Sequence, residues 1–220
     1  MNSATAPALS LLGTRALLFE APGETSLPTQ QRIWALAREA QTWPEVREAV
    51  PGMNNLMLSF ARPPAALHAL EARLCSMWTT IEPLPLQGRI VELPVVYGGD
   101  GGPHLRDVVA HTGLRIDEIV ERHSTRLYPV FALGSHPGYC YLGGMDPRLA
   151  TPRRKVPVLR IPGGAVSIGG TQTGVSASDG PSGWNTIGCT SMGFFDPTQD
   201  PPALLQPGDS IRFRVEKVLR

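Results

Sequence analysis

The uneven distribution of glycine and proline is the feature that most limits how this chain can fold. Of its 220 residues, 23 are glycine and 22 are proline, and most of them lie beyond residue 94. Both residue types interrupt regular elements and favour turns, because glycine adopts left-handed backbone conformations and proline lacks an N–H donor. We therefore expect regular α/β structure first and short strands between turns afterwards.

The first part of the chain, residues 1–85, is predicted to be a small α/β domain. Its hydrophobic pattern indicates strand, helix, strand and helix in that order, at residues 15–20, 26–40, 54–60 and 64–78. Ser26 is expected to cap the first helix, with Pro28 in its first turn. Residues 1–13 are interpreted as a loose tail, and not as a signal peptide, because no basic segment precedes their short apolar run.

The second part, residues 86–220, is predicted to be mainly β-structure, so that the whole chain is of the α+β class. Two short helices are expected, at 104–113 and 115–124, and Gly113 is expected to end the first of them. Many short strands separated by Gly/Pro turns favour a closed or barrel-like sheet. The expected strands lie at residues 89–99, 126–134, 165–170, 171–176, 184–189 and 209–218.

Composition excludes several classes of protein. Hydrophobic residues make up 42% and charged residues 18%, which is typical of a globular protein. The net charge of +1 does not favour nucleic acid as a partner, and no apolar run is long enough to span a membrane. Cys75, Cys140 and Cys189 form no C-x-x-C pair, so that neither a zinc site nor a disulfide framework is predicted and a reducing cytoplasm fits best.

The segment 134–155, "GSHPGYCYLGGMDPRLATPRRK", carries the densest chemistry of the chain. Its glycines could bring backbone N–H groups to a phosphate, although both common phosphate-binding glycine motifs are absent, and a turn-rich connection between strands is the alternative. It also holds a cationic cluster that could bind a carboxylate or phosphate, or could form a solvated basic patch. The cluster consists of Arg148, Arg153, Arg154 and Lys155.

Two histidines and one thiol need separate interpretation. His136 could act as a general acid or base, but no orienting acid accompanies it, and a surface or hydrogen-bonding role is the alternative. Cys140 is interpreted as a packed thiol rather than a nucleophile. His123 falls on the apolar face of its predicted helix, which indicates a core or interface residue.

A second polar, glycine-rich segment spans residues 169–184, "GGTQTGVSASDGPSGW". Its amide, hydroxyl and indole groups could line a small-molecule pocket, and ordinary β-turns are the alternative. The side chains in question are Gln172, Thr173, Asp179 and Trp184. No metal-ligand spacing occurs, so no metal site is predicted, and no self-sufficient catalytic group is visible.

Several long motifs resemble one known family. They are "PGMNNLMLSF", "VVYGGDGGPHLRDVVAHTGLRIDEIVERHS", "PGYCYLGGMDPRLATPRRKVP", "IPGGAVSIGGTQTGV" and "GPSGWNTIGCT", in the family's order. Over roughly residues 14–215 the chain is similar to the B subunit of 5-oxoprolinase, also called allophanate hydrolase subunit 1. That family includes the sporulation-kinase inhibitor and one half of the carboxyltransferase domain of urea carboxylase.

The resemblance implies a fold, partners and an activity. The fold would be an N-terminal α/β, ferredoxin-like domain followed by a cyclophilin-like β-barrel. The partners would be a homologous C subunit, whose barrel would share a site with this one, and a separate A subunit. The complex would use ATP with a divalent cation to open 5-oxoproline to glutamate, and this chain alone would be inactive.

The resemblance also implies site residues, although it assigns none of them a catalytic role. Together with His136 and Asp179, the candidate positions for the substrate or ATP are Gly143, Gly144, Asp146, Arg148, Arg153, Gly170, Gln172, Thr173, Gly174 and Trp184.

The chain departs from the family pattern at two places. Ser135 replaces an aromatic residue, Cys140 replaces a proline, and Ser176-Ala177 replaces a tyrosine–proline pair. These changes are expected to add room or polarity to a pocket, so that the substrate could be another lactam or a urea-type amide. Two other functions stay open: a carboxyltransferase half, for which this chain has no biotin-attachment sequence, and a non-enzymatic inhibitor of a sensor histidine kinase.

Overall fold

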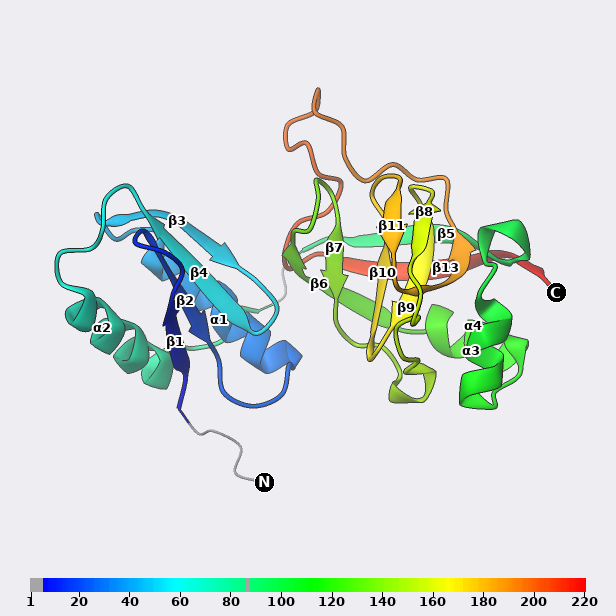
Figure 1. Ribbon diagram of the computed structural model, residues 1–220, viewed down its shortest axis with the longest axis horizontal. Coiled ribbons are helices and arrows are strands. Elements are labelled where there is room, and N and C mark those ends of the chain that lie inside the picture. The colour runs from blue at the N-terminus through cyan, green and yellow to red at the C-terminus, as the bar shows by residue number, and fades with distance from the viewer. Residues whose placement is uncertain (1–5, 86–87) are drawn as a thin grey trace. The chain divides into compact units, whose positions relative to one another are not determined.

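The computed structural model describes residues 6–85 and 88–220. The chain divides into two compact units, within residues 1–86 and 87–220, and each has its own hydrophobic core (Figure 1). This division adjoins the boundary expected at residues 85–86. In the described parts of the chain, none of the helices is both long and apolar enough to cross a membrane.

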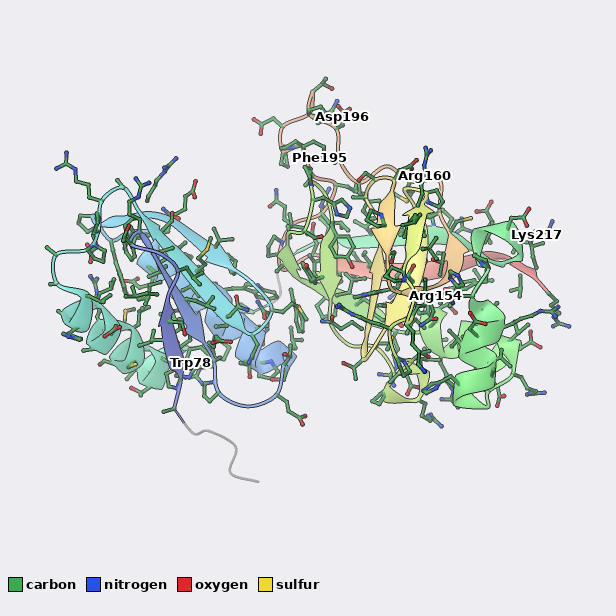
Figure 2. All side chains as sticks on the ribbon, viewed as in Figure 1. Trp78, Arg154, Arg160, Phe195, Asp196 and Lys217 are labelled. Atoms are coloured by element: carbon green, nitrogen blue, oxygen red, sulfur yellow. The ribbon has the colours of Figure 1, made fainter. Side chains whose placement is uncertain are left out.

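The first unit is a four-stranded antiparallel sheet with two helices. The strand order is β1-β2-β4-β3, and α1 packs against β3 and β4. Its elements are β1 (Ala8–Leu11), β2 (Ala16–Glu20), α1 (Leu27–Ala40), β3 (Val46–Pro51), β4 (Asn55–Phe60) and α2 (Leu67–Thr80). Phe19 and Trp78, which is labelled in Figure 2, contribute from β2 and α2 to the core of this unit.

The predicted cap of α1 is confirmed. Ser26 has extended backbone angles, and its hydroxyl accepts a hydrogen bond from the Thr29 N–H at 3.3 Å. Pro28 lies in the first turn, as expected. The ferredoxin-like arrangement of this unit stays a prediction.

The interpretation of residues 1–13 as a loose tail was wrong for β1. Residues 8–11 pair with β2 along their whole length, and Leu9 packs against the hydrophobic core. The strand escaped notice because only one of its four side chains is even partly buried, which hides the alternation that marks a strand. The strand β3 was also missed, because its sequence VREAVP lacks the regular alternation of apolar and polar residues that marks a strand.

The second unit is a seven-stranded, nearly closed sheet. The strand order is β10-β9-β12-β5-β13-β6-β7, and the two edge strands, β10 and β7, lie against each other (Figure 1). These strands are β5 (Ile90–Gly98), β6 (Leu127–Leu133), β7 (Cys140–Leu142), β9 (Ala165–Gly169), β10 (Gln172–Val175), β12 (Asn185–Cys189) and β13 (Ser210–Leu219). The predicted barrel-like sheet is therefore present.

Short elements complete the second unit. Strands β8 (Val158–Ile161) and β11 (Gly180–Ser182) form a separate two-stranded sheet, and α3 (Leu105–Thr112) and α4 (Ile116–Ser124) are the two expected helices. Gly113 ends α3 in a left-handed conformation with φ 70°, as predicted. Strands β7, β8 and β11 were missed, because three or four residues between turns do not show a period.

Candidate functional site

The second unit contains a cavity of about 520 Å³ beside the closing edge of the sheet. Its wall comes from the loop between β6 and β7, the strands β9 and β10, and the segment that contains β11. The lining residues are Ser135, His136, Tyr139, Tyr141, Arg153, Ser167, Gly174, Ser176, Ser178, Asp179, Gly180, Pro181, Ser182, Gly183 and Trp184. The structure thus brings together the two segments that the sequence singled out, 134–155 and 169–184.

Aromatic side chains form one side of the cavity. The rings of Tyr139 and Tyr141 meet edge to face, with their centroids 5.1 Å apart. A Cβ atom at Gly174 would lie 2.9 Å from the hydroxyl oxygen of Tyr139, and one at Gly169 would lie 2.5 Å from the indole of Trp184. Both glycines are therefore required so that the aromatic rings can pack on the sheet.

The loop that carries His136 is tightly folded. Ser135 has a positive φ of 63°, and the His136 N–H donates to the Gly134 carbonyl at 2.7 Å, which makes a three-residue turn. The Gly134 N–H donates in turn to the Tyr139 carbonyl at 3.1 Å. These bonds hold the His136 ring at the cavity, 5.1 Å from the ring of Tyr139.

The ring nitrogen Nε2 of His136 is buried, and no residue of the described chain forms a hydrogen bond with it. A buried polar atom without a partner is unfavourable, because its hydrogen-bonding capacity is unused. The residue as a whole lines the cavity, so His136 stays among the candidate site residues.

Arg153 is the cation of the cavity. Its guanidinium carbon lies 5.7 Å from the centroid of the Trp184 ring, and the structure shows no ion pair for it within residues 6–85 and 88–220. The other basic residues of the cluster lie elsewhere: Arg154 binds Asp107 at 2.6 Å, Arg148 contacts Asp146 at 3.6 Å, and Lys155 is exposed.

Asp179 lines the cavity but is already bound. Its carboxylate accepts hydrogen bonds from the Gly163 N–H at 2.9 Å and from Arg160 at 2.7 Å; Arg160 lies on β8 (Figure 2). The Gly163 N–H and, after it, Arg160 lower the pKa of Asp179, which keeps the carboxylate ionised. Its charge is therefore largely neutralised by Arg160.

Three of the candidates belong to a structural cluster that does not line the cavity. The buried carboxylate of Asp146 contacts three arginines, Arg122 at 3.2 Å and Arg126 and Arg148 at 3.6 Å. The Arg148 N–H and these guanidinium groups lower the pKa of Asp146. Gly143 precedes this cluster, and a Cβ atom there would lie 2.2 Å from the Phe131 ring.

Four further candidates shape the sheet around the cavity without lining it. Gly144 and Gly170 adopt positive φ angles of 88° and 63°, and Gly170 exchanges two backbone hydrogen bonds with Thr151. Gln172 begins β10 opposite Gly169. Thr173, the next residue, is buried and accepts a hydrogen bond from His123.

His123 is fully buried, which confirms that it is a core residue. The Thr173 hydroxyl donates to the Ser167 carbonyl at 3.1 Å, so it accepts from the Nε2–H of His123 at 2.8 Å. The Tyr97 hydroxyl then donates to Nδ1 at 2.8 Å. Burial lowers the pKa of His123 to about 3, so the ring is neutral, and this chain of hydrogen bonds ends at Ser167, which lines the cavity.

Sequence reasoning missed most of the hydroxyl groups of the cavity. Five serines line it: Ser135, Ser167, Ser176, Ser178 and Ser182. Only the departures from the family pattern pointed to two of them, Ser135 and Ser176. Cys140 is buried, and burial raises the pKa of its thiol to about 12, which confirms that it is a packed thiol.

A family model described as "Carboxyltransferase domain, subdomain C and D" matches residues 7–205. The chain belongs to this carboxyltransferase-domain family. Two relatives are both named as the B subunit of 5-oxoprolinase: the Escherichia coli O157:H7 protein is 47% identical over 94% of this chain and 95% of its own, and the Haemophilus influenzae protein is 38% identical over 92% and 95%.

Solved structures share the fold of this chain. The crystal structure of TTHA0988 matches 92% of the chain with a TM-score of 0.75 and 31% identity, and this chain spans 40% of its length. The Kluyveromyces lactis urea carboxylase matches 95% of the chain with a TM-score of 0.78 at 19% identity, over 22% of its own length. The chain therefore has a carboxyltransferase-like α+β fold.

Proposed function

We propose that this chain is one subunit of a 5-oxoprolinase-type, ATP-dependent hydrolase that opens 5-oxoproline to glutamate. The observation that carries the proposal is the 47% identity, across 94% of the chain, to the B subunit of a 5-oxoprolinase. The carboxyltransferase and kinase-inhibitor alternatives are not favoured, because the curated relatives share the oxoprolinase name.

The cavity supports a role in binding the small substrate. It offers one cation, five serine and two tyrosine hydroxyls, and aromatic rings, which together suit a small polar ring. ATP supplies phosphoryl transfer to the amide oxygen, which activates the otherwise stable amide. Arg153 and the hydroxyls would then bind and orient the substrate.

The cavity does not fit a divalent cation. Its one carboxylate, Asp179, is held by Arg160 and the Gly163 N–H, and no group of three His, Cys, Asp or Glu side chains that could hold a metal occurs in residues 6–85 and 88–220. ATP and its cation are therefore proposed to bind mainly on the partners, which are a homologous C subunit and a separate A subunit. The unpaired thiols of Cys75, Cys140 and Cys189 suit the proposed cytoplasmic location.

Co-expression of the chain with these two partners tests this proposal. The purified complex, supplied with ATP, Mg²⁺ and 5-oxoproline, is expected to form glutamate and ADP in equal amounts, and this chain alone is expected to form neither. A well-folded complex that hydrolyses ATP without forming glutamate would contradict the proposal.

A further inference from the structure

The cavity holds one positive charge that nothing in the described chain balances. Arg153 lines it and has no ion-pair partner there, whereas the carboxylate on the same wall, Asp179, is paired with Arg160 at 2.7 Å. Burial raises the pKa of Tyr139 to about 12, so its phenol is neutral. Arg153 acts in the opposite direction on this pKa, which shows that its positive charge is felt at the Tyr139 hydroxyl. The cavity is thus prepared for an anion.

The remaining walls favour a flat ring. Trp184 and Tyr139 pack on Gly169 and Gly174, where any side chain would displace them. The five serine hydroxyls can bind further polar atoms of the ligand. A small planar ring would therefore lie among aromatic faces, with polar atoms reached from the rim.

From these features we infer that the cavity binds a small, negatively charged lactam with its carboxylate on Arg153. This inference rests on the proposed function, and it deepens that proposal by naming the residue that recognises the charge of the substrate.

Isothermal titration of the co-purified complex with 5-oxoproline and with 2-pyrrolidinone tests the assignment. The second compound has the same ring and amide but lacks the carboxylate. Arg153→Gln is expected to weaken 5-oxoproline about 10- to 100-fold, because a charge-assisted hydrogen bond is lost, and to leave 2-pyrrolidinone unchanged.

Lys155→Gln is the matched control, since it removes an exposed cation of the same segment that does not line the cavity. The inference is overturned if the wild-type complex binds 5-oxoproline no better than 2-pyrrolidinone. It is also overturned if Arg153→Gln behaves like Lys155→Gln. Turnover is a separate readout: a complex that binds 5-oxoproline through Arg153 but forms no glutamate contradicts only the proposed activity, whereas normal KM in Arg153→Gln contradicts only the inference.

Discussion

At the scale of single residues, His123 shows how burial decides protonation. The ring is fully buried, stacks on Phe213 with centroids 4.4 Å apart, and uses both nitrogens in hydrogen bonds to Tyr97 and Thr173. A charged imidazole would lose its hydration on burial. Its Nδ1 would also carry an N–H, and could then no longer accept the hydrogen bond from the Tyr97 hydroxyl. The folded state therefore keeps the ring neutral, and its pKa falls to about 3.

This pKa predicts a dependence of stability on pH. Between the ordinary pKa of about 6.5 and the folded-state value of about 3, the unfolded chain binds a proton that the folded chain does not. The free energy of unfolding should therefore fall as the pH is lowered through this window. From about pH 7.5 to about pH 5 the loss due to His123 is expected to be about 2 kcal/mol.

Urea unfolding of wild type and His123→Gln at these pH values measures that loss. Glutamine can accept from Tyr97 and donate to Thr173 but cannot titrate, so the variant should lose about 2 kcal/mol less than wild type. His68→Gln, at an exposed position, should retain the wild-type slope. Equal slopes in His123→Gln and wild type would contradict a neutral buried His123.

At the scale of secondary-structure elements, β1 is the edge strand of the first sheet. Its residues pair with β2 from Ala8↔Glu20 to Leu11↔Leu17, and Leu9 packs against the core. Leu11, two residues on, is 52% exposed. The strand therefore contributes backbone pairing along its length but apolar burial at one position.

Alanine substitutions at these two leucines test whether β1 is an integral strand. Leu9→Ala should lower the free energy of unfolding by about 1–2 kcal/mol, because it removes a partly buried side chain. Leu11→Ala removes the same atoms from an exposed site and should change stability by less than about 0.5 kcal/mol. Chemical denaturation compares them, and two equal, negligible effects would restore the interpretation as a loose tail.

At the scale of the whole molecule, each unit has its own hydrophobic core. Among the described residues, the core cluster of the first unit draws on residues 9–81 alone, and that of the second on residues 91–218 alone. The entire cavity belongs to the second unit. Units of this kind commonly fold alone.

A fragment of residues 86–220 should therefore fold without the first unit. It is expected to unfold cooperatively in urea and to give dispersed amide resonances, because its core cluster contains no described residue of the first unit. A fragment that lacks dispersed resonances and a cooperative transition would show that the predicted domain boundary is wrong.

Short sequence patterns predicted correctly those features whose physical cause lies within a few residues of the chain. The cap at Ser26, the left-handed Gly113 and the apolar face that buries His123 each depend on residues a few positions apart. Strands without alternation could not be found in this way: β1 and β3 are defined by their pairing with β2 and β4, which lie elsewhere in the chain.

The candidate site divides in the same manner. Composition and motifs marked both segments that meet in the cavity and placed Arg153, Asp179 and Trp184 among its residues. They did not separate Arg153 from Asp146 and Arg148, which form a structural ion-pair cluster. Arg148 and Arg153 carry the same charge, so the sequence does not distinguish them. Only the structure shows that Arg148 contacts Asp146, whereas Arg153 has no ion pair among the described residues.

By itself, the sequence determined the family, the α+β class, the positions of α1 to α4 and the two segments that form the candidate site. The tertiary structure decided which arginine lacks a partner among the described residues, which histidine is neutral in the core and which faces a cavity, and which serines join it. The physical reason is that these properties depend on neighbours far away in the chain. His123 and Thr173 are 50 residues apart, and Arg154 and Asp107 are 47 apart, yet each pair is in hydrogen-bond contact.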